Sequence, residues 1–366
     1  MSLVQPKKKP SYKSFFLLLL LLFASRFVFN AHDKASADQL STTGLKSIRP
    51  PTQRRTELAA RKGCKNKFVR YTAHDFELTW SKSINDLKSE DPNWEVGCAK
   101  LREDSNKVKG ILAGLKQHIH SPERDLSRFP LSHYEYEDTC TGQRSKVYIE
   151  PLISFLRHPY AICFDGSDSM VLDKSYLMLP FAKEILVSNT RTWLFDAGAS
   201  TYDNGAGGAS QSWFVNTYRE RGIEFDRIIG WEAAPTDPNE QWGSVPADIK
   251  RKTSWFNIPA TTGVHDADNP LTFIKELTKV EDFVVFKLDV DAPFVEIALV
   301  QQILQDPELL HLIDEFYFEH HVTGSPVQWR GWGNQSLVGA PLNDIQDSYV
   351  IFTTLREHGI RAHSWV

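Results

Sequence analysis

A short segment, Arg191-Thr-Trp-Leu-Phe-Asp-Ala-Gly-Ala-Ser200, sets the fold class that we expect for this chain. Thr192 to Phe195 suit a buried strand, and small residues follow the acid at Asp196. A hydrophobic strand that runs into a small-residue turn before a helix forms one wall of the ligand crevice in open α/β sheets. Because small residues let the backbone approach a ligand closely, we predict a nucleotide-like ligand beside this turn.

The carboxyl-terminal half alternates between expected strands and helices. The strands are expected at residues 192–196, 227–231, 254–258, 283–288, 315–318 and 360–365, and the helices at residues 210–221, 270–279, 293–304 and 345–358. Asn269 and Pro270 supply a helix cap and a first-turn proline. The alternation predicts an α/β fold with a doubly wound parallel sheet and helices on both faces. We assign residues 151–366 to this domain.

Residues 62–150 are less regular, and we interpret them as a small cap region on the α/β domain. The spacing of apolar residues predicts helices at residues 108–118 and around Trp80, Ile84 and Leu87, whereas residues 134–140 are expected to be extended. Further short helices are expected at residues 149–159 and 176–186, the second broken at Pro180.

The amino terminus has the pattern of a targeting segment. Residues 1–13 are basic, and residues 14–30 hold a run of Phe and Leu that is short for a hydrocarbon core of about 30 Å. Two interpretations stay open: the signal-anchor of a single-pass type II membrane protein, with Arg26 at the lumenal interface, or a signal peptide cleaved at Ala35-Ser-Ala37. Residues 31–61 are polar and predict a flexible stem. We expect the rest of the chain in the Golgi lumen, or secreted if the segment is cleaved.

Cysteine usage and charge agree with this location. Cys64, Cys98, Cys140 and Cys163 could form disulfide bonds in an oxidising compartment. Proximity favours Cys64 with Cys98 and Cys140 with Cys163, and four free buried thiols are the alternative. Asn334-Gln-Ser336 is an acceptor sequon for glycosylation. The net charge of −4 shows no basic excess, so we expect no nucleic-acid partner.

Acidic residues end three of the expected strands: Asp196, Glu232 and Asp289. In this class of sheet, carboxylates at strand ends point into the ligand crevice. Glu232 stands where nucleotide-binding folds place an acid that accepts hydrogen bonds from ribose hydroxyls. The alternative is that neighbouring backbone amides satisfy these carboxylates.

Leu194-Phe-Asp-Ala-Gly-Ala-Ser200 resembles the first motif of S-adenosylmethionine-dependent methyltransferases. Its combination with Gly230-Trp-Glu-Ala-Ala-Pro235 and Phe286-Lys-Leu-Asp-Val-Asp-Ala-Pro-Phe-Val-Glu296 is similar to the FkbM-type branch of that family. Phe316-Tyr-Phe-Glu-His-His321 resembles the strand that comes next in that branch. The resemblance covers residues 192–366 and none of residues 31–149.

The resemblance implies a Rossmann-like class I methyltransferase sheet that binds S-adenosyl-L-methionine. It implies that Asp196, Gly198 and Ser200 contact this cofactor, with Gly198 under its methionine part, and that Glu232 binds its ribose. Two departures stand out. Asp291-Ala292, followed by Pro293, replaces the Glu-Gly of the family, and the loop after Ser200 is longer and Gly-rich. A non-catalytic relative therefore stays open.

Methyl transfer to a hydroxyl needs an aligned acceptor and a base. The candidates for the base are Asp289, Asp291, His320 and His321, from two strand ends that should be neighbours. The alternative for the two histidines is one packed ring and one solvated ring. The Asp pair and a His could also bind a divalent metal, although the sequence alone assigns no metal ligands.

We therefore expect an O-methyltransferase of the secretory lumen that acts on a hydroxyl of a glycan or small molecule. The glycan follows from the expected compartment and not from residues. One alternative is a glycosyltransferase, in which Asp289-x-Asp291 holds a metal ion against a nucleotide-sugar. The other is a catalytically inert binding protein with a methyltransferase-like fold.

Overall fold

The computed structural model describes residues 66–86, 125–139, 141–152, 174–185, 190–203, 211–322 and 341–365, all within the compact unit Arg49–Val366. The expected targeting segment, the stem, the four cysteines, the sequon and the helix at 108–118 lie outside these residues. Among the residues described, no helix combines the length and the apolar character needed to cross a bilayer.

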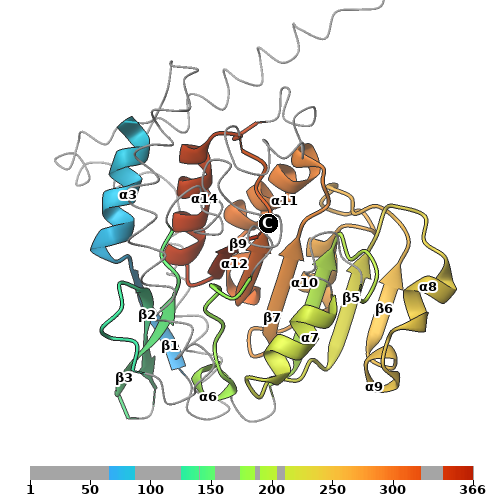
Figure 1. Ribbon diagram of the computed structural model, residues 1–366, viewed down its shortest axis with the longest axis horizontal. Coiled ribbons are helices and arrows are strands. Elements are labelled where there is room, and N and C mark those ends of the chain that lie inside the picture. The colour runs from blue at the N-terminus through green and yellow to red at the C-terminus, as the bar shows by residue number, and fades with distance from the viewer. Residues whose placement is uncertain are drawn as a thin grey trace, which may run out of the picture. The chain divides into compact units, whose positions relative to one another are not determined.

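The central feature is a six-stranded sheet in which every neighbouring pair is parallel. Its strands are β4 (Thr192–Ala197), β5 (Arg227–Trp231), β6 (Thr253–Phe256), β7 (Phe283–Leu288), β8 (Glu315–Phe318) and β9 (Arg361–Ser364). They lie in the order β6-β5-β4-β7-β8-β9 (Figure 1). The chain order therefore reverses between β4 and β7, which is the arrangement of doubly wound dinucleotide-binding sheets. The predicted mixed α/β fold with a parallel sheet is confirmed.

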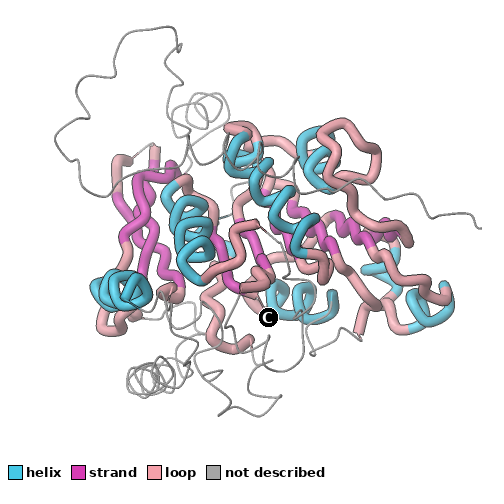
Figure 2. Tube along the Cα trace, turned by 90° about the horizontal axis from the view of Figure 1, so that it is seen from above, coloured by secondary structure: helices cyan, strands magenta, loops and turns pink. Residues whose placement is uncertain are grey.

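Helices cover both faces of this sheet (Figure 2). They are α7 (Gln211–Arg219), α8 (Pro238–Gly243), α9 (Ala247–Lys250), α10 (Pro270–Leu277), α11 (Pro293–Gln305), α12 (Leu309–Leu312) and α14 (Ile345–Glu357). Phe214 of α7 packs edge-on against Tyr317 at 5.0 Å, whereas Phe352 of α14 packs against Phe318 at 5.9 Å. Because successive strand residues point to opposite faces, α7 and α14 lie on opposite sides of β8.

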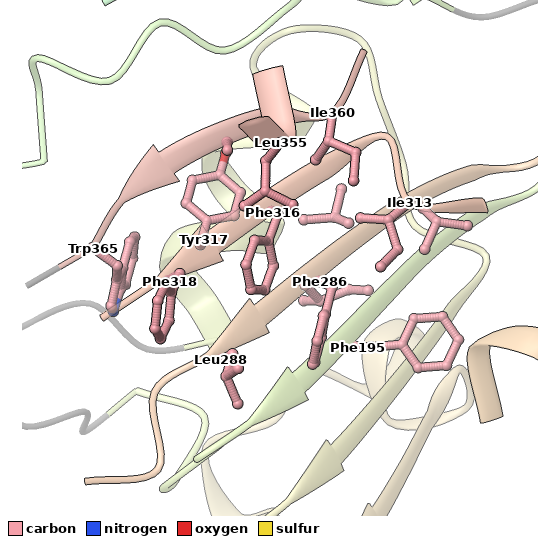
Figure 3. Close-up of a cluster of buried hydrophobic side chains, with 14 of the residues drawn as sticks. Phe195, Phe286, Leu288, Ile313, Phe316, Tyr317, Phe318, Leu355, Ile360 and Trp365 are labelled. Carbon is pink, nitrogen blue, oxygen red and sulfur yellow. The ribbon is translucent and has the colours of Figure 1, made fainter. Parts of the chain in front are cut away.

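Aromatic side chains fill the core between the sheet and the helices. Figure 3 shows Phe286 and Phe316 extending from adjacent strands, with Phe195 and Phe318 close by. The rings of Phe286 and Phe316 stack 5.4 Å apart, and both residues are fully buried. Every residue of β4, β7 and β8 is buried, as expected of central parallel strands covered on both faces. Every residue of the edge strand β9 is buried as well.

The expected helix starts are confirmed at two prolines. Asn269 caps α10 by accepting a 2.9 Å hydrogen bond from the Leu271 amide, and Pro270 is the first helical residue. Pro293 likewise begins α11. Both prolines stand where a helix does not need their missing N–H.

The described part of residues 62–150 forms an antiparallel sheet and one helix. The sheet contains β1 (Asn66–Thr72), β2 (Ser132–Asp138) and β3 (Arg144–Ile149), in that order, and the helix is α3 (Asp75–Asp86). The tyrosine hydroxyl of Tyr134 donates to the Ile360 carbonyl at 2.8 Å, and Arg356 donates to the Glu150 carbonyl at 2.9 Å. These bonds join the small sheet to the β9 side of the large sheet.

Two expected helices are corrected. Ile149 ends strand β3 and does not begin a helix, because it and Val147 fill buried positions two residues apart along the strand. Of the helix expected at residues 176–186, the structure has only α6 (Ala182–Ile185). The segment before it forms a turn at residues 175–176 and is irregular up to Pro180, which has no amide hydrogen for a helical bond.

Candidate functional site

The ends of β4 and β7 meet at the point where the strand order reverses. The Asp289 amide donates to the Ala197 carbonyl at 3.0 Å. Gly198 follows with φ of +86°, and a Cβ there would lie 1.5 Å from the Asp289 carbonyl oxygen. Only glycine fits such an approach, so packing of the two strand ends explains Gly198 without a ligand.

The buried side chain of Lys287 joins these two strand ends. Its ammonium lies 3.3 Å from Oδ1 of Asp196 and 3.2 Å from Oδ2 of Asp289, and only 5% of its side chain is exposed. It also donates a 2.7 Å hydrogen bond to the Gly198 carbonyl. A buried ammonium is stable only where it is paired and hydrogen-bonded, and here it has three acceptors.

The two carboxylates beside Lys287 differ in their titration. Burial raises the pKa of Asp196 in spite of the opposing charge of Lys287. Burial would also raise the pKa of Asp289, but the charge of Lys287, together with hydrogen bonds from Glu319 and Lys287 and the charge of Lys174, lowers that pKa. The indole Nε1 of Trp365 donates to Oδ2 of Asp289 at 3.1 Å. Asp289 is therefore an ionised and well-held carboxylate.

Glu232 lies against the turn that follows β4. Its Oε2 accepts a 2.8 Å hydrogen bond from the Ser200 amide, and its Oε1 accepts a 2.7 Å bond from the Ala234 amide. The amides of Gly198 and Ala199 both donate to the Trp231 carbonyl, at 3.0 and 2.9 Å. The structure thus brings together Glu232, Ser200 and Gly198, with Asp196 at the end of the adjoining strand. Backbone amides do bind the Glu232 carboxylate, and each of its oxygens keeps a second lone pair for a ligand.

A second cluster of acids lies at the carboxyl ends of β7 and β8 and the start of α11. Nε2 of His321 lies 3.3 Å from Oε2 of Glu319, 3.8 Å from Oδ1 of Asp291 and 3.9 Å from Oε2 of Glu296. Asp289 adjoins the same group through Glu296 and Glu319. His321, Glu296 and Glu319 are buried, whereas the Asp291 side chain is 84% exposed.

Burial and mutual repulsion raise the pKa values of the two buried carboxyl groups of this cluster. Burial, followed by the negative charge of Asp289, raises the pKa of Glu319 to about 7. Burial and the nearby Glu319 and Asp289 hold the pKa of Glu296 well above its usual range. Several carboxylates that cannot all ionise at neutral pH are typical of sites that handle protons or cations.

The structure separates the two histidines that the sequence proposed together. His320 stacks on Phe318 and its Nε2 is 2.7 Å from the Leu342 carbonyl oxygen, so it does not join the cluster. His321 does join it. Both rings are buried, so the alternative of one packed and one solvated ring is wrong.

Four residues of this region are absent from the sequence-based set: Lys287, Glu296, Glu319 and Trp365. Lys287 could have been selected from the sequence, because it is the one charged residue in an apolar strand. A charge in a buried strand needs a buried partner. Glu319 stands directly after a strand, where the sequence argument had selected only the histidines. Glu296 and Trp365 carry no local signal, because their roles depend on which elements pack beside them.

Comparisons with protein families, with curated proteins and with solved structures find no match for this chain. The chemistry of the site must therefore be argued from its own geometry. This edge of the sheet contains the ionised Asp289 beside the turn after β4, and the buried Lys287 that joins the ends of β4 and β7. It also contains the acid–histidine cluster, in which the carboxylate of Asp291 is exposed.

Proposed function

We propose that this chain is an S-adenosylmethionine-dependent O-methyltransferase. The donor would lie over the turn from Asp196 to Ser200, with the ribose hydroxyls at Glu232. The observation that carries the proposal is the contact between Glu232 and the Ser200 amide, which aligns an acid with a small-residue turn at the edge of a doubly wound sheet. Ligands of such sheets bind in the crevice at the carboxyl ends of the strands, beside the reversal of strand order.

The acceptor hydroxyl would approach from the side of Asp291. Burial and then the charge of Asp289 raise the pKa of Asp291, and the charge of Glu232 adds to this rise. This effect supports the placement of Glu232 and Asp291 on one edge of the sheet. In the reaction, the acceptor oxygen forms a bond to the methyl carbon while the carbon–sulfur bond breaks, and the hydroxyl proton passes to a base. Asp291 is the candidate base, because its exposed carboxylate is the one a bulky acceptor can reach. For the expected lumenal location, a glycan hydroxyl is the acceptor we propose.

A thermal-shift panel on the purified full-length chain tests the ligand class. S-adenosylhomocysteine at about 100 times its Kd should add about 2.7 kcal/mol to the stability of the folded state. UDP- or GDP-sugars with Mn²⁺ should produce no comparable shift. A shift with a nucleotide-sugar alone would replace the methyltransferase by the glycosyltransferase alternative, and no shift with either would favour an inert binding protein.

A further inference from the structure

Three side chains converge on one point at the carboxyl ends of β7 and β8. One oxygen each from Asp291 and Glu319, with a ring nitrogen of His321, lie within 4.8 Å of one another. One oxygen each from Asp289, Glu296 and Glu319 form a second group of the same size. Both groups share Glu319, so the two groups adjoin and together contain five side chains.

Two buried atoms of this cluster have no hydrogen-bond partner among the residues that the structure describes. They are Nε2 of His321 and Oε2 of Glu296, which face each other at 3.9 Å. The two residues are 4% and 1% exposed. Buried polar atoms are nearly always bonded, so each exception needs a reason. An atom that binds both an imidazole nitrogen and a carboxylate oxygen would satisfy them together.

The charge around Glu296 points to a cation. One oxygen of its buried carboxylate lies within 4.8 Å of one oxygen each from Asp289 and Glu319. Lys287 pairs with Asp289 at 3.2 Å, and the same ammonium also pairs with Asp196 and donates to the Gly198 carbonyl. A dication among these acids would convert repulsion into attraction.

The distances and donor types suit a transition-metal ion. Two ligands bound at about 2.0–2.2 Å to one ion lie roughly 3–4 Å apart. The distances from His321 to Glu319 and to Asp291 are 3.3 and 3.8 Å. Carboxylates are the ligands that Mn²⁺ prefers, and imidazole favours first-row ions over Mg²⁺ and Ca²⁺.

We propose that Asp291, Glu319 and His321, with Glu296 and Asp289 beside them, form a site for a divalent first-row cation such as Mn²⁺ or Zn²⁺. The site does not depend on the donor proposed above, because none of its three principal ligands belongs to residues 196–200 or to Glu232. It stands at the exposed carboxylate where an acceptor would arrive.

The test is a titration of the purified, chelator-treated full-length chain with Mn²⁺, followed by electron paramagnetic resonance, and with Zn²⁺, followed by calorimetry. We expect one ion per chain in the wild type. Asp291→Asn should weaken binding at least ten-fold, and His321→Gln should abolish it. Asn tolerates the left-handed backbone at position 291, where φ is +53°, so this variant should fold normally.

Two variants serve as matched controls. His320→Gln changes the neighbouring imidazole, which faces Leu342, and Asp248→Asn changes an exposed carboxylate paired with Arg219 at 3.3 Å. Both should bind the metal as the wild type does. The proposal is overturned if the wild type binds neither ion, or if Asp291→Asn binds as tightly as the wild type. Unweakened binding by Asp291→Asn overturns the proposal even if His321→Gln does not fold.

Discussion

The ammonium of Lys287 donates a 2.7 Å hydrogen bond to the carbonyl oxygen of Gly198, and so fastens the end of β7 to the turn after β4. Around this bond lie the two carboxylates that end the same strands, Asp196 and Asp289. The turn that we propose as the donor site therefore depends on a buried lysine that would not contact the donor.

Replacement of Lys287 by Met should destabilise the fold. The change leaves Asp196 and Asp289 near each other without their buried cation, and loss of one partner of a buried ion pair typically costs about 3–5 kcal/mol. Urea denaturation measures this difference. Lys275→Met is the matched control, because Lys275 pairs with Asp306 at 2.8 Å at the surface and its loss should cost at most about 1 kcal/mol. Equal losses in the two variants would contradict this account of Lys287.

Replacement of Gly198 by Ala should be more severe than its backbone angle alone predicts. Alanine at positive φ costs about 1–2 kcal/mol, and at Gly198 the new methyl would also meet the Asp289 carbonyl at 1.5 Å. We expect a total loss above about 4 kcal/mol, measured by denaturation or by failure to fold. Gly142→Ala isolates the angle, since Gly142 has φ of +69° and nothing within 4 Å of its Cβ position. If both variants lose the same free energy of unfolding, the close contact with the Asp289 carbonyl does not explain the glycine at position 198.

A buried histidine should make stability depend on pH. Nδ1 of His363 lies 2.7 Å from Oε1 of Glu150. Burial would lower the pKa of His363, but the charges of Glu150 and Glu315 and the hydrogen bonds to both carboxylates together raise that pKa above its usual 6.5. Burial would raise the pKa of Glu150, but the charge and hydrogen bond of His363, with the charge of Arg356 and the Met178 amide, together lower it below 4.5.

The signs of these shifts define the pH window. The His363 contribution is complete below pH 6.5 and is lost as pH rises through the raised pKa. The Glu150 contribution is complete above pH 4.5 and is lost as pH falls through the lowered pKa. His363→Gln should therefore lose most stability, about 1.5–3 kcal/mol, between pH 4.5 and 6.5, and less at pH 9. Denaturation at several pH values checks this, with His265→Gln on an exposed loop as the control. A loss that does not vary with pH would contradict the ion pair.

The sequence was sufficient to predict most of the sheet. β5, β7 and β8 have the predicted bounds, because strands buried on both faces leave a mostly apolar run in the sequence. The helix starts at Pro270 and Pro293 were equally local signals. The helix predicted to start at Ile149 is wrong, because a short apolar run before a proline is compatible with a helix or with a strand end.

The candidate site was less predictable, because its contacts join distant segments. Lys287 bonds to Gly198 across 89 positions of sequence. Glu296 had the pattern of a first-turn helix residue, and only the packing of α11 buries it beside Glu319. His320 and His321 are adjacent, and their opposite directions follow from the path of the chain after β8. Glu232 was predicted from its position alone, and the structure brings it to the turn.

The most direct test of the donor site is calorimetric titration of S-adenosylhomocysteine into the wild-type chain and into Glu232→Gln, with Glu240→Gln on the exposed helix α8 as the control. Hydrogen bonds to a charged group contribute about 1.5–3 kcal/mol, so Glu232→Gln should bind at least ten-fold more weakly, while Glu240→Gln binds as the wild type does. No measurable binding by the wild type, or equal binding by Glu232→Gln, would contradict the proposal that Glu232 and the turn after β4 hold an adenosine-bearing donor.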